Sequence, residues 1–189
     1  MSLLTIETKY TKLEDIPREE WGPVFWYMIH ILAYNFHPKF ADEYTTFIYE
    51  YINILPCPIC KNHFKDLLKN MAPRTRNRED LIDWSIIVHN LVNKRLDKKI
   101  YTRSETDLLY EVIRYQRIID FLEYLQLFIK IDPTLARKAS TIKMIKVFVK
   151  IIPCDHCREI IQKYGRNNSI TANNIVDYIE KVVEVLKTN

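Results

Sequence analysis

Glycine is the residue that this sequence most clearly lacks. Only two glycines, Gly22 and Gly165, occur in 189 residues. The turn that holds a dinucleotide in a Rossmann fold and the loop that cradles phosphates in nucleotide-binding proteins both need several closely spaced glycines. Neither motif can be written anywhere in this chain. Any nucleotide cofactor must therefore occupy another kind of site.

Long apolar runs and a strong excess of one charge are also missing. No apolar stretch approaches the ~18 residues of a membrane-spanning helix, and the polar segment from Met1 to Asp15 does not resemble a secretory signal. The 28 basic and 24 acidic residues give a formal net charge of only +4. We therefore expect no membrane insertion, no nucleic-acid partner and a cytoplasmic location.

The chain does contain enough apolar residues, 48%, to bury a core. These residues recur at helical spacing, and prolines and capping residues mark the breaks. Ser104 is expected to cap a long amphipathic stretch to Ile131. The pattern predicts an all-α protein whose first four helices form a bundle; they are expected at about Pro23–Phe36, Lys39–Ile54, Pro58–Leu68 and Asn77–Leu96.

Cysteine occurs four times, as the two Cys-x-x-Cys pairs Cys57/Cys60 and Cys154/Cys157. In a chain with no recognisable secretory signal this number does not suggest a disulfide scaffold, which leaves redox chemistry and metal binding. The first pair lies at the amino end of a predicted helix that begins near Pro58. Unpaired N–H groups at that helix end favour thiolate and lower the thiol pKa. The first pair therefore has the features of a redox centre.

Two other classes of protein compete with a redox enzyme. Both cysteine pairs, with His63 and His156 as further donors, could form a zinc-binding structural module. The 93 residues between the pairs far exceed the usual gap in such modules, so we disfavour it. An inactive scaffolding relative is the other alternative, and the intact Cys57 and Cys60 argue against it. A thioredoxin-like protein is disfavoured because no strand pattern precedes the first pair.

The second half of the sequence repeats the first in degenerate form. Residues 151–157, IIPCDHC, align with residues 54–60, ILPCPIC, at an offset of 97. The repeat keeps the Pro-Cys-x-x-Cys but loses polar residues that lie beside it in the first half. On the flanking alignments Trp26 becomes Phe121, His30 becomes Leu125, His89 becomes Val183, Asn90 becomes Glu184 and Asn93 becomes Lys187.

An ordered series of residues in the first half resembles a known family. His89 and Asn93, one helical turn apart, share one face of a helix. In order, spacing and identity, the series resembles the Erv/ALR family of FAD-linked sulfhydryl oxidases over about residues 17–105, and the composition resembles the forms from large DNA viruses. The series comprises Trp21-Gly22, Trp26, His30, Pro56-Cys57-x-x-Cys60, Trp84, His89-Asn90-x-Val92-Asn93, Leu96, Lys98 and Tyr101.

The resemblance implies a fold and a cofactor. The fold is a four-helix bundle plus a short fifth helix with FAD across its mouth, followed by a degenerate second helical bundle. The domains would be a tail at 1–16, the oxidase domain at 17–105 and the repeat at 106–189. No metal is implied. The residues expected to bind FAD are Gly22, Trp26, His30, Tyr34, His89, Asn90, Val92, Asn93, Leu96, Lys98 and Tyr101.

The resemblance also implies a reaction. A protein dithiol or a thioredoxin-like carrier would attack Cys57, and Cys60, nearer the flavin ring, would pass the electron pair to it. Molecular oxygen would then accept the electrons and yield hydrogen peroxide. Pro23 stands where cellular members usually carry Arg, which leaves one phosphate contact unaccounted for.

The repeat leaves two questions open. The family usually forms dimers through its bundle, so the chain would be a homodimer or, with the repeat in the partner's place, an intramolecular pseudo-dimer. The pair Cys154/Cys157 would be a shuttle disulfide, a structural disulfide or a relic kept by packing. We slightly favour a structural disulfide, because Pro153 and the local helix pattern persist while the flanking cofactor residues do not. Synthesis in the cytoplasm, of the host if the protein is viral, would place it there or in the virus particle.

Overall fold

The computed structural model describes residues 9–167 and 169–188, and all regular structure in these ranges is helical. This confirms the all-α prediction. Two 3-10 turns, Leu13–Asp15 and Pro38–Phe40, precede the first and second α-helices. The α-helices are α1 (Arg18–Tyr34), α2 (Ala41–Ile54), α3 (Pro58–Asn70), α4 (Arg78–Arg95), α5 (Arg103–Tyr110), α6 (Tyr115–Ile131), α7 (Leu135–Ile151), α8 (Asp155–Asn167) and α9 (Ile175–Thr188).

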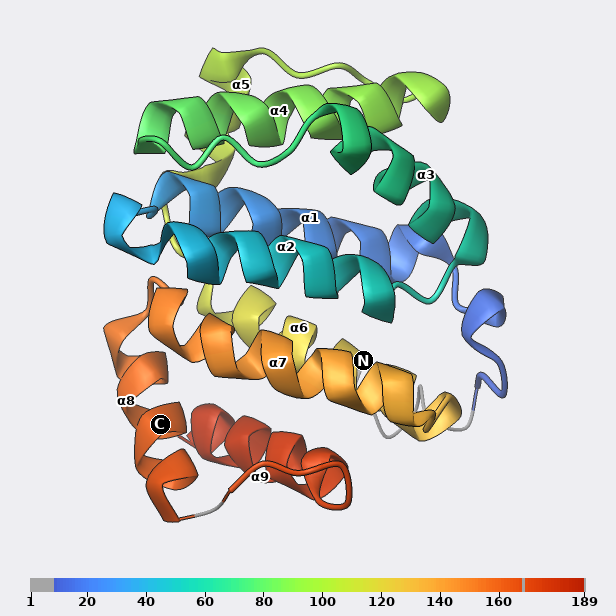
Figure 1. The fold of residues 1–189 in the computed structure, drawn as a ribbon, viewed down its shortest axis with the longest axis vertical. Helices are drawn as coiled ribbons and strands as arrows, with labels where there is room; N and C mark the ends of the chain where they lie inside the picture. Colours follow the sequence, from blue (N-terminus) through green and yellow to red (C-terminus); the bar gives the residue numbers. More distant parts are fainter. Residues whose placement is uncertain (1–8, 168, 189) are drawn as a thin grey trace.

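The second half of the chain repeats the helix order of the first, with α6 to α9 following α1 to α4. Within each half the first helix packs on the fourth, α1 on α4 and α6 on α9. Between the halves α2 packs on α7 and α1 on α6. Figure 1 shows the result as stacked layers, with α4 and α5 at one end, α1 and α2 next, then α6 and α7, and α9 at the far end.

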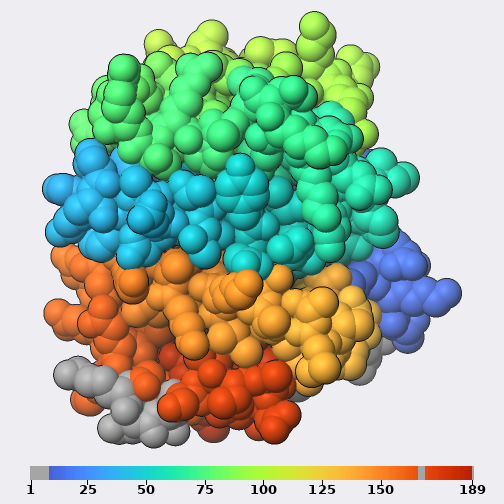
Figure 2. Space-filling view, in the orientation of Figure 1, coloured from blue at the N-terminus to red at the C-terminus, as the bar shows by residue number. Residues whose placement is uncertain are grey.

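Aromatic side chains fill the space between the halves. Phe25 in α1 contacts Phe121 and Phe128 in α6, with ring centroids 5.0 and 5.5 Å apart, and Phe47 in α2 stacks on Phe148 in α7 at 5.9 Å. All five are buried. The atoms of α2 and α7 meet along a continuous border in the space-filling view (Figure 2). The two halves therefore share one apolar core.

Capping groups explain where the helices of the first half begin. Asn77 accepts the N–H of Asp80 at 2.8 Å to start α4, as the sequence predicted. Thr102 starts α5 through a capping box with Glu105, so the prediction of Ser104 as the cap is wrong. The helix at the chain's beginning starts at Arg18 rather than at Pro23, which lies inside α1.

The long amphipathic stretch predicted after Ser104 is also two helices, not one. Helix α5 ends at Tyr110, and α6 begins at Tyr115. The N–H of Arg114, between them, donates to the Tyr27 hydroxyl at 2.6 Å. This contact turns the chain from the first half to the second. In the described part of the chain, no helix has the length and apolarity to cross a membrane.

Candidate active site

The first cysteine pair lies where α2 gives way to α3. Cys57 is the N-cap of α3, and its Sγ accepts the N–H of Cys60 at 3.1 Å. The two cysteines are joined as a disulfide. Ile59, between them, is 71% exposed, whereas Pro56 is buried. The disulfide is thus held at a helix amino end, at the surface, where the helix dipole and free N–H groups stabilise a thiolate on reduction.

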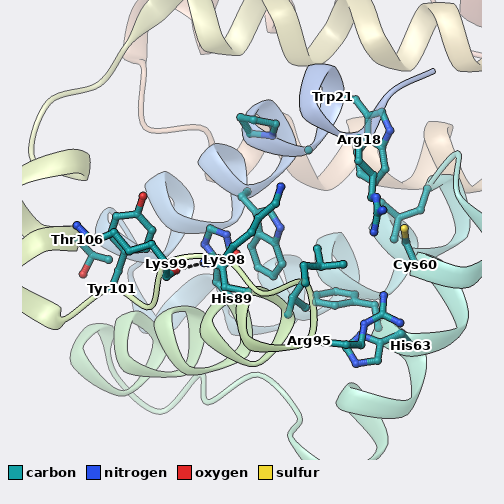
Figure 3. Close-up of a pocket in the computed structure, with 18 of the residues that line it drawn as sticks. Arg18, Trp21, Cys60, His63, His89, Arg95, Lys98, Lys99, Tyr101 and Thr106 are labelled. Carbon is teal, nitrogen blue, oxygen red and sulfur yellow. Dashed lines mark hydrogen bonds between the residues drawn. The ribbon is translucent and has the colours of Figure 1, made fainter.

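A cavity of about 350 Å³ adjoins this disulfide. Cys60 lines one end of it, near Arg18 and Trp21, and Tyr101 and Thr106 lie at the other (Figure 3). Cys57 is not among the lining residues. Eight of the eleven residues predicted to bind a cofactor line this cavity together: Gly22, Trp26, His89, Val92, Asn93, Leu96, Lys98 and Tyr101.

Trp26 and His89 form a flat aromatic wall in the middle of the cavity. Their rings are parallel within 5°, with centroids 4.0 Å apart. Trp26 comes from α1 and His89 from α4, so the packing of these two helices creates the stack. Phe64 of α3 meets the Trp26 ring edge-on at 5.8 Å. Such a wall offers a π-face to a planar ligand.

His30 does not line the cavity but lies directly behind His89. Its Nδ1 is 2.9 Å from the Ser85 hydroxyl, and its Nε2 is 2.8 Å from Nδ1 of His89. Because Ser85 donates its own proton to the Ile82 carbonyl, we assign the His30 Nδ1–H as donor to Ser85. His30 Nε2 then accepts the Nδ1–H of His89. Nε2 of His89 is left as an acceptor.

Burial keeps both histidines neutral. The pKa of His30 is lowered well below its usual value, first by burial and then by the nearby His89. Burial also lowers the pKa of His89 to about 4, with a smaller contribution from the Lys98 charge. The hydrogen-bonded pair therefore keeps one arrangement of protons across the physiological range.

Tyr34 and Asn90, also predicted to bind a cofactor, likewise lie outside the cavity. Each of them forms hydrogen bonds to a residue that lines the cavity. The Tyr34 hydroxyl bonds to Thr106 at 3.2 Å and to Asp107 at 2.7 Å. The Asn90 amide bonds to both backbone groups of Tyr101, accepting its N–H at 3.0 Å and donating to its carbonyl at 2.7 Å. Both side chains fasten α5 and the segment before it onto α1 and α4.

The second cysteine pair has the same local geometry in another setting. Cys154 and Cys157 form a disulfide at the amino end of α8, and Cys154 Sγ accepts the Cys157 N–H at 3.1 Å. Cys157 is fully buried. The two pairs lie at the amino ends of different helices, α3 and α8, and these helices lie at opposite sides of the stack in Figure 1. Among the described residues no group of three or more His, Cys, Asp or Glu is placed to hold a metal ion, so the zinc-module alternative is not favoured.

Known proteins are similar to the half of the chain that contains the cavity. The model of the Erv1 / Alr family matches residues 23–111. The FAD-linked sulfhydryl oxidase of African swine fever virus is 41% identical over 110 residues, 55% of this chain and 87% of the relative. This chain belongs to the Erv1/Alr family. No solved structure matches it significantly.

Other Erv1/Alr relatives are viral and cellular. A "Probable FAD-linked sulfhydryl oxidase" of Acanthamoeba polyphaga mimivirus is 37% identical over 95 residues, 46% of this chain and 66% of the relative. The FAD-linked sulfhydryl oxidase of Arabidopsis thaliana is 27% identical over 110 residues, 56% of this chain and 58% of the relative. The sequence-based resemblance to the family and to its viral forms is confirmed.

The cavity suits the cofactor that the Erv1/Alr family implies. Beyond the aromatic wall, its rim carries the cations Arg18, Arg95, Lys98 and Lys99, all exposed. A flat apolar slot with a cationic rim fits a ligand that combines planar rings with a pyrophosphate, as FAD does. The residues present therefore fit FAD.

Sequence reasoning missed several of these lining residues. Arg18 lies four residues before Gly22 and eight before Trp26, so the same helical stripe could have revealed it. Arg95 follows Val92 by three residues, and His63 follows Cys60 by the same interval. The remaining residues that were missed are Trp21, Pro23, Tyr51, Leu55, Phe64, Lys99, Thr106, Leu109 and Tyr110, and most come from elements that only the tertiary fold brings to the cavity.

Proposed function

We propose that this protein is an FAD-linked sulfhydryl oxidase that forms disulfide bonds in protein dithiols and delivers the electrons to molecular oxygen. One observation carries the proposal. Cys60 of a surface disulfide lines the same cavity as the Trp26–His89 wall and the cationic rim. A thiol-reactive bond is thereby joined to a site suited to a flavin nucleotide.

The two cysteines would divide the work by position. A substrate thiolate attacks Cys57, breaks the Cys57–Cys60 bond and forms a mixed disulfide, while Cys60 leaves as the thiolate. The second substrate thiol then attacks the same substrate sulfur, releasing the substrate disulfide and Cys57. The amino end of α3 stabilises the thiolates. Cys60 is the inner residue because it lines the cavity and Cys57 does not.

Bound FAD supplies the two-electron acceptor beside Cys60, so that two thiols and O₂ give one disulfide and H₂O₂ in total. Trp26 and His89 would contact a planar ring of the cofactor. Arg18, Arg95, Lys98 and Lys99 would neutralise its pyrophosphate. Arg18 and Arg95 would supply the positive charge that Pro23 does not.

We further propose that the chain is an intramolecular pseudo-dimer. The repeat covers the outer faces of α1 and α2 with α6 and α7, which supports a monomer in which the repeat takes a partner's place. A thioredoxin-like carrier or another protein dithiol is the proposed substrate. Kinship with proteins of two viruses supports a place in the host cytoplasm or the virus particle.

The absorption spectrum of the purified protein tests the proposed activity. We expect a flavin spectrum that bleaches when dithiothreitol is added without oxygen, and peroxide production in air. Cys60→Ser should keep the flavin spectrum and abolish both effects, because no sulfur remains beside the cavity to give up electrons. The double variant Cys154→Ser/Cys157→Ser is the matched control and should still bleach. A protein that purifies without flavin and fails to bind added FAD would refute the proposal.

A further inference from the structure

The carboxyl end of α2, which leads into the Cys57–Cys60 disulfide, is held by a residue of the other half. Arg137 in α7 donates from Nη1 to the carbonyl of Ile54, the last residue of α2, at 2.5 Å. Its Nε donates to Asp132 at 2.9 Å. The Arg137 side chain is only 9% exposed. A buried guanidinium that bonds to a helix-end carbonyl and to a carboxylate makes a rigid clamp.

A second cation joins Arg137 at this helix end. Lys61, next to Cys60, donates from Nζ to the carbonyl of Asn53 at 3.0 Å. The pKa of Lys61 is lowered, first by burial and then by the charges of Lys65 and Arg137. The last carbonyls of a helix carry partial negative charge. Two cations therefore offset that charge directly before the redox disulfide.

The segment before the second pair is braced in a different way. The carbonyl of Ile152, which precedes the second pair, accepts a hydrogen bond of 2.6 Å from Arg158, a residue of the adjoining α8. At an offset of 95, the position that corresponds to Arg137 in the first half is Asp42, which is exposed. The second disulfide is thus braced within its own half, while the first is braced from outside.

We propose that Arg137 of the repeat is a positioning residue for the Cys57–Cys60 disulfide. Cys57 is three residues beyond Ile54, so the Cα atoms of the two residues lie within ~11 Å of each other. The clamp fixes the segment from Leu55 to Cys57 against the cavity. Its charge also favours the thiolate that forms when the disulfide is reduced. The significance for catalysis rests on the proposed oxidase function, but the effect on the disulfide can be measured without it.

The test is a redox titration that resolves the two disulfides of the full-length protein. The chain is equilibrated with buffers that contain reduced and oxidised dithiothreitol. As a protein S–S bond breaks, its two sulfurs take up the two protons and two electrons of the reagent's dithiol, and the reagent becomes a cyclic disulfide. Free thiols are then alkylated, and each pair is quantified by peptide mass spectrometry. Cys154/Cys157 serves as the internal reference.

Arg137→Met should lower the equilibrium constant for reduction of Cys57/Cys60 by about threefold to tenfold, because Asp132 and the helix end are left uncompensated. A tenfold change corresponds to about 30 mV for this two-electron couple. Cys154/Cys157 should not change. Asp132→Asn should raise the equilibrium constant for reduction of Cys57/Cys60. A merely structural role of Arg137 would not produce these opposite shifts in the two variants. If Arg137→Met does not fold, Arg137→Gln takes its place, with the same expected direction.

Lys150→Met is the matched control. Lys150 also reaches from α7 to α2, but it pairs with Glu43 at the other end of that helix, at 2.9 Å. Its loss should leave both disulfides unchanged. An unchanged Cys57/Cys60 equilibrium in Arg137→Met, or equal shifts of both pairs, would overturn the proposal. If the protein instead shows the shift but binds no flavin, only the oxidase function fails.

Discussion

Of two neutral histidines, His89 forms part of the aromatic wall of the cavity and His30 lies behind it, and burial decides the protonation of both. His30 is fully buried and hydrogen-bonded on both nitrogens, to Ser85 and His89. His89 lies between His30 and the stacked Trp26. A proton added to His30 Nε2 would set two N–H donors against each other, and a proton on either ring would place a charge in an apolar setting. This explains why the pKa of each is lowered rather than raised.

These lowered pKa values predict a particular pH dependence of stability. Between about pH 6.5 and 4 the unfolded chain protonates both histidines, whereas the folded chain resists protonation. The free energy of unfolding should therefore fall as the pH drops, by up to ~1.4 kcal/mol per pH unit for each histidine. Urea unfolding at a series of pH values measures this dependence of the free energy of unfolding on pH. His89→Gln should flatten this slope, and exposed His156→Gln is the control. An equal slope in wild type and His89→Gln would contradict the assignment.

At the scale of residues, the sequence predicted part of the cavity lining. Trp26, His89 and Asn93 line the cavity as expected because helical spacing put them on facing stripes. His30 and Tyr34 share the α1 stripe with Trp26 but lie deeper along the helix, where α4 and α5 cover them. Spacing fixes the face of a helix, whereas the extent of a cavity along that face depends on tertiary packing.

At the scale of elements, the segment between α4 and α5 forms one wall of the cavity without regular structure. Lys98, Lys99 and Tyr101 belong to it and line the cavity. Asp97 adopts a positive φ of 52° at its turn. Asn90 pins its far end through both backbone groups of Tyr101. Asn93, also in α4, donates its amide to the Lys99 carbonyl at 3.0 Å. The position of these side chains therefore depends on two amides in α4, of which Asn90 makes two of the three hydrogen bonds.

Replacing the Asn90 amide should loosen the segment between α4 and α5. Asn90→Ala removes two hydrogen bonds, and we expect the dissociation constant for FAD to rise about tenfold, or ~1.4 kcal/mol, because the segment must be ordered on binding. Titration of flavin-free protein with FAD, followed by fluorescence, measures the change. Asn70→Ala is the matched control: its amide donates at the surface of α3, away from the cavity. FAD affinity that stays at the wild-type value would show that the segment is held without Asn90.

The sequence predicted helices wherever apolar periodicity met a cap or a proline, but it missed the break between α5 and α6. Apolar residues continue through this region at helical spacing, and Leu108 and Val112 are nevertheless 79% and 69% exposed. At the turn, the N–H of Arg114 donates to the Tyr27 hydroxyl in α1, 87 residues earlier in the sequence. Local periodicity cannot reveal a contact between residues so far apart.

At the scale of the whole molecule, the two halves are joined by a buried aromatic cluster rather than by a linker alone. Phe121 of α6 contacts Phe25, Phe47 and Phe148, with ring centroids between 5.0 and 6.0 Å apart. Ion pairs such as Lys143–Glu50, at 3.2 Å, lie at the rim of this interface. The repeat has lost the polar residues of the cavity but kept its apolar face. Helices α6 and α7 of the repeat pack on α1 and α2 through this face.

This shared core predicts that the halves unfold together. All three tryptophans, at positions 21, 26 and 84, lie in the first half, so their fluorescence reports on that half alone. Phe121→Ala, made in the repeat, should cost about 3–5 kcal/mol and move the tryptophan transition to lower urea by ~1–2 M. Leu135→Ala, at a residue of the repeat that is 76% exposed, should leave it in place. Two independent domains would instead keep the tryptophan transition of Phe121→Ala at the wild-type midpoint, because the lost contacts would destabilise only the repeat.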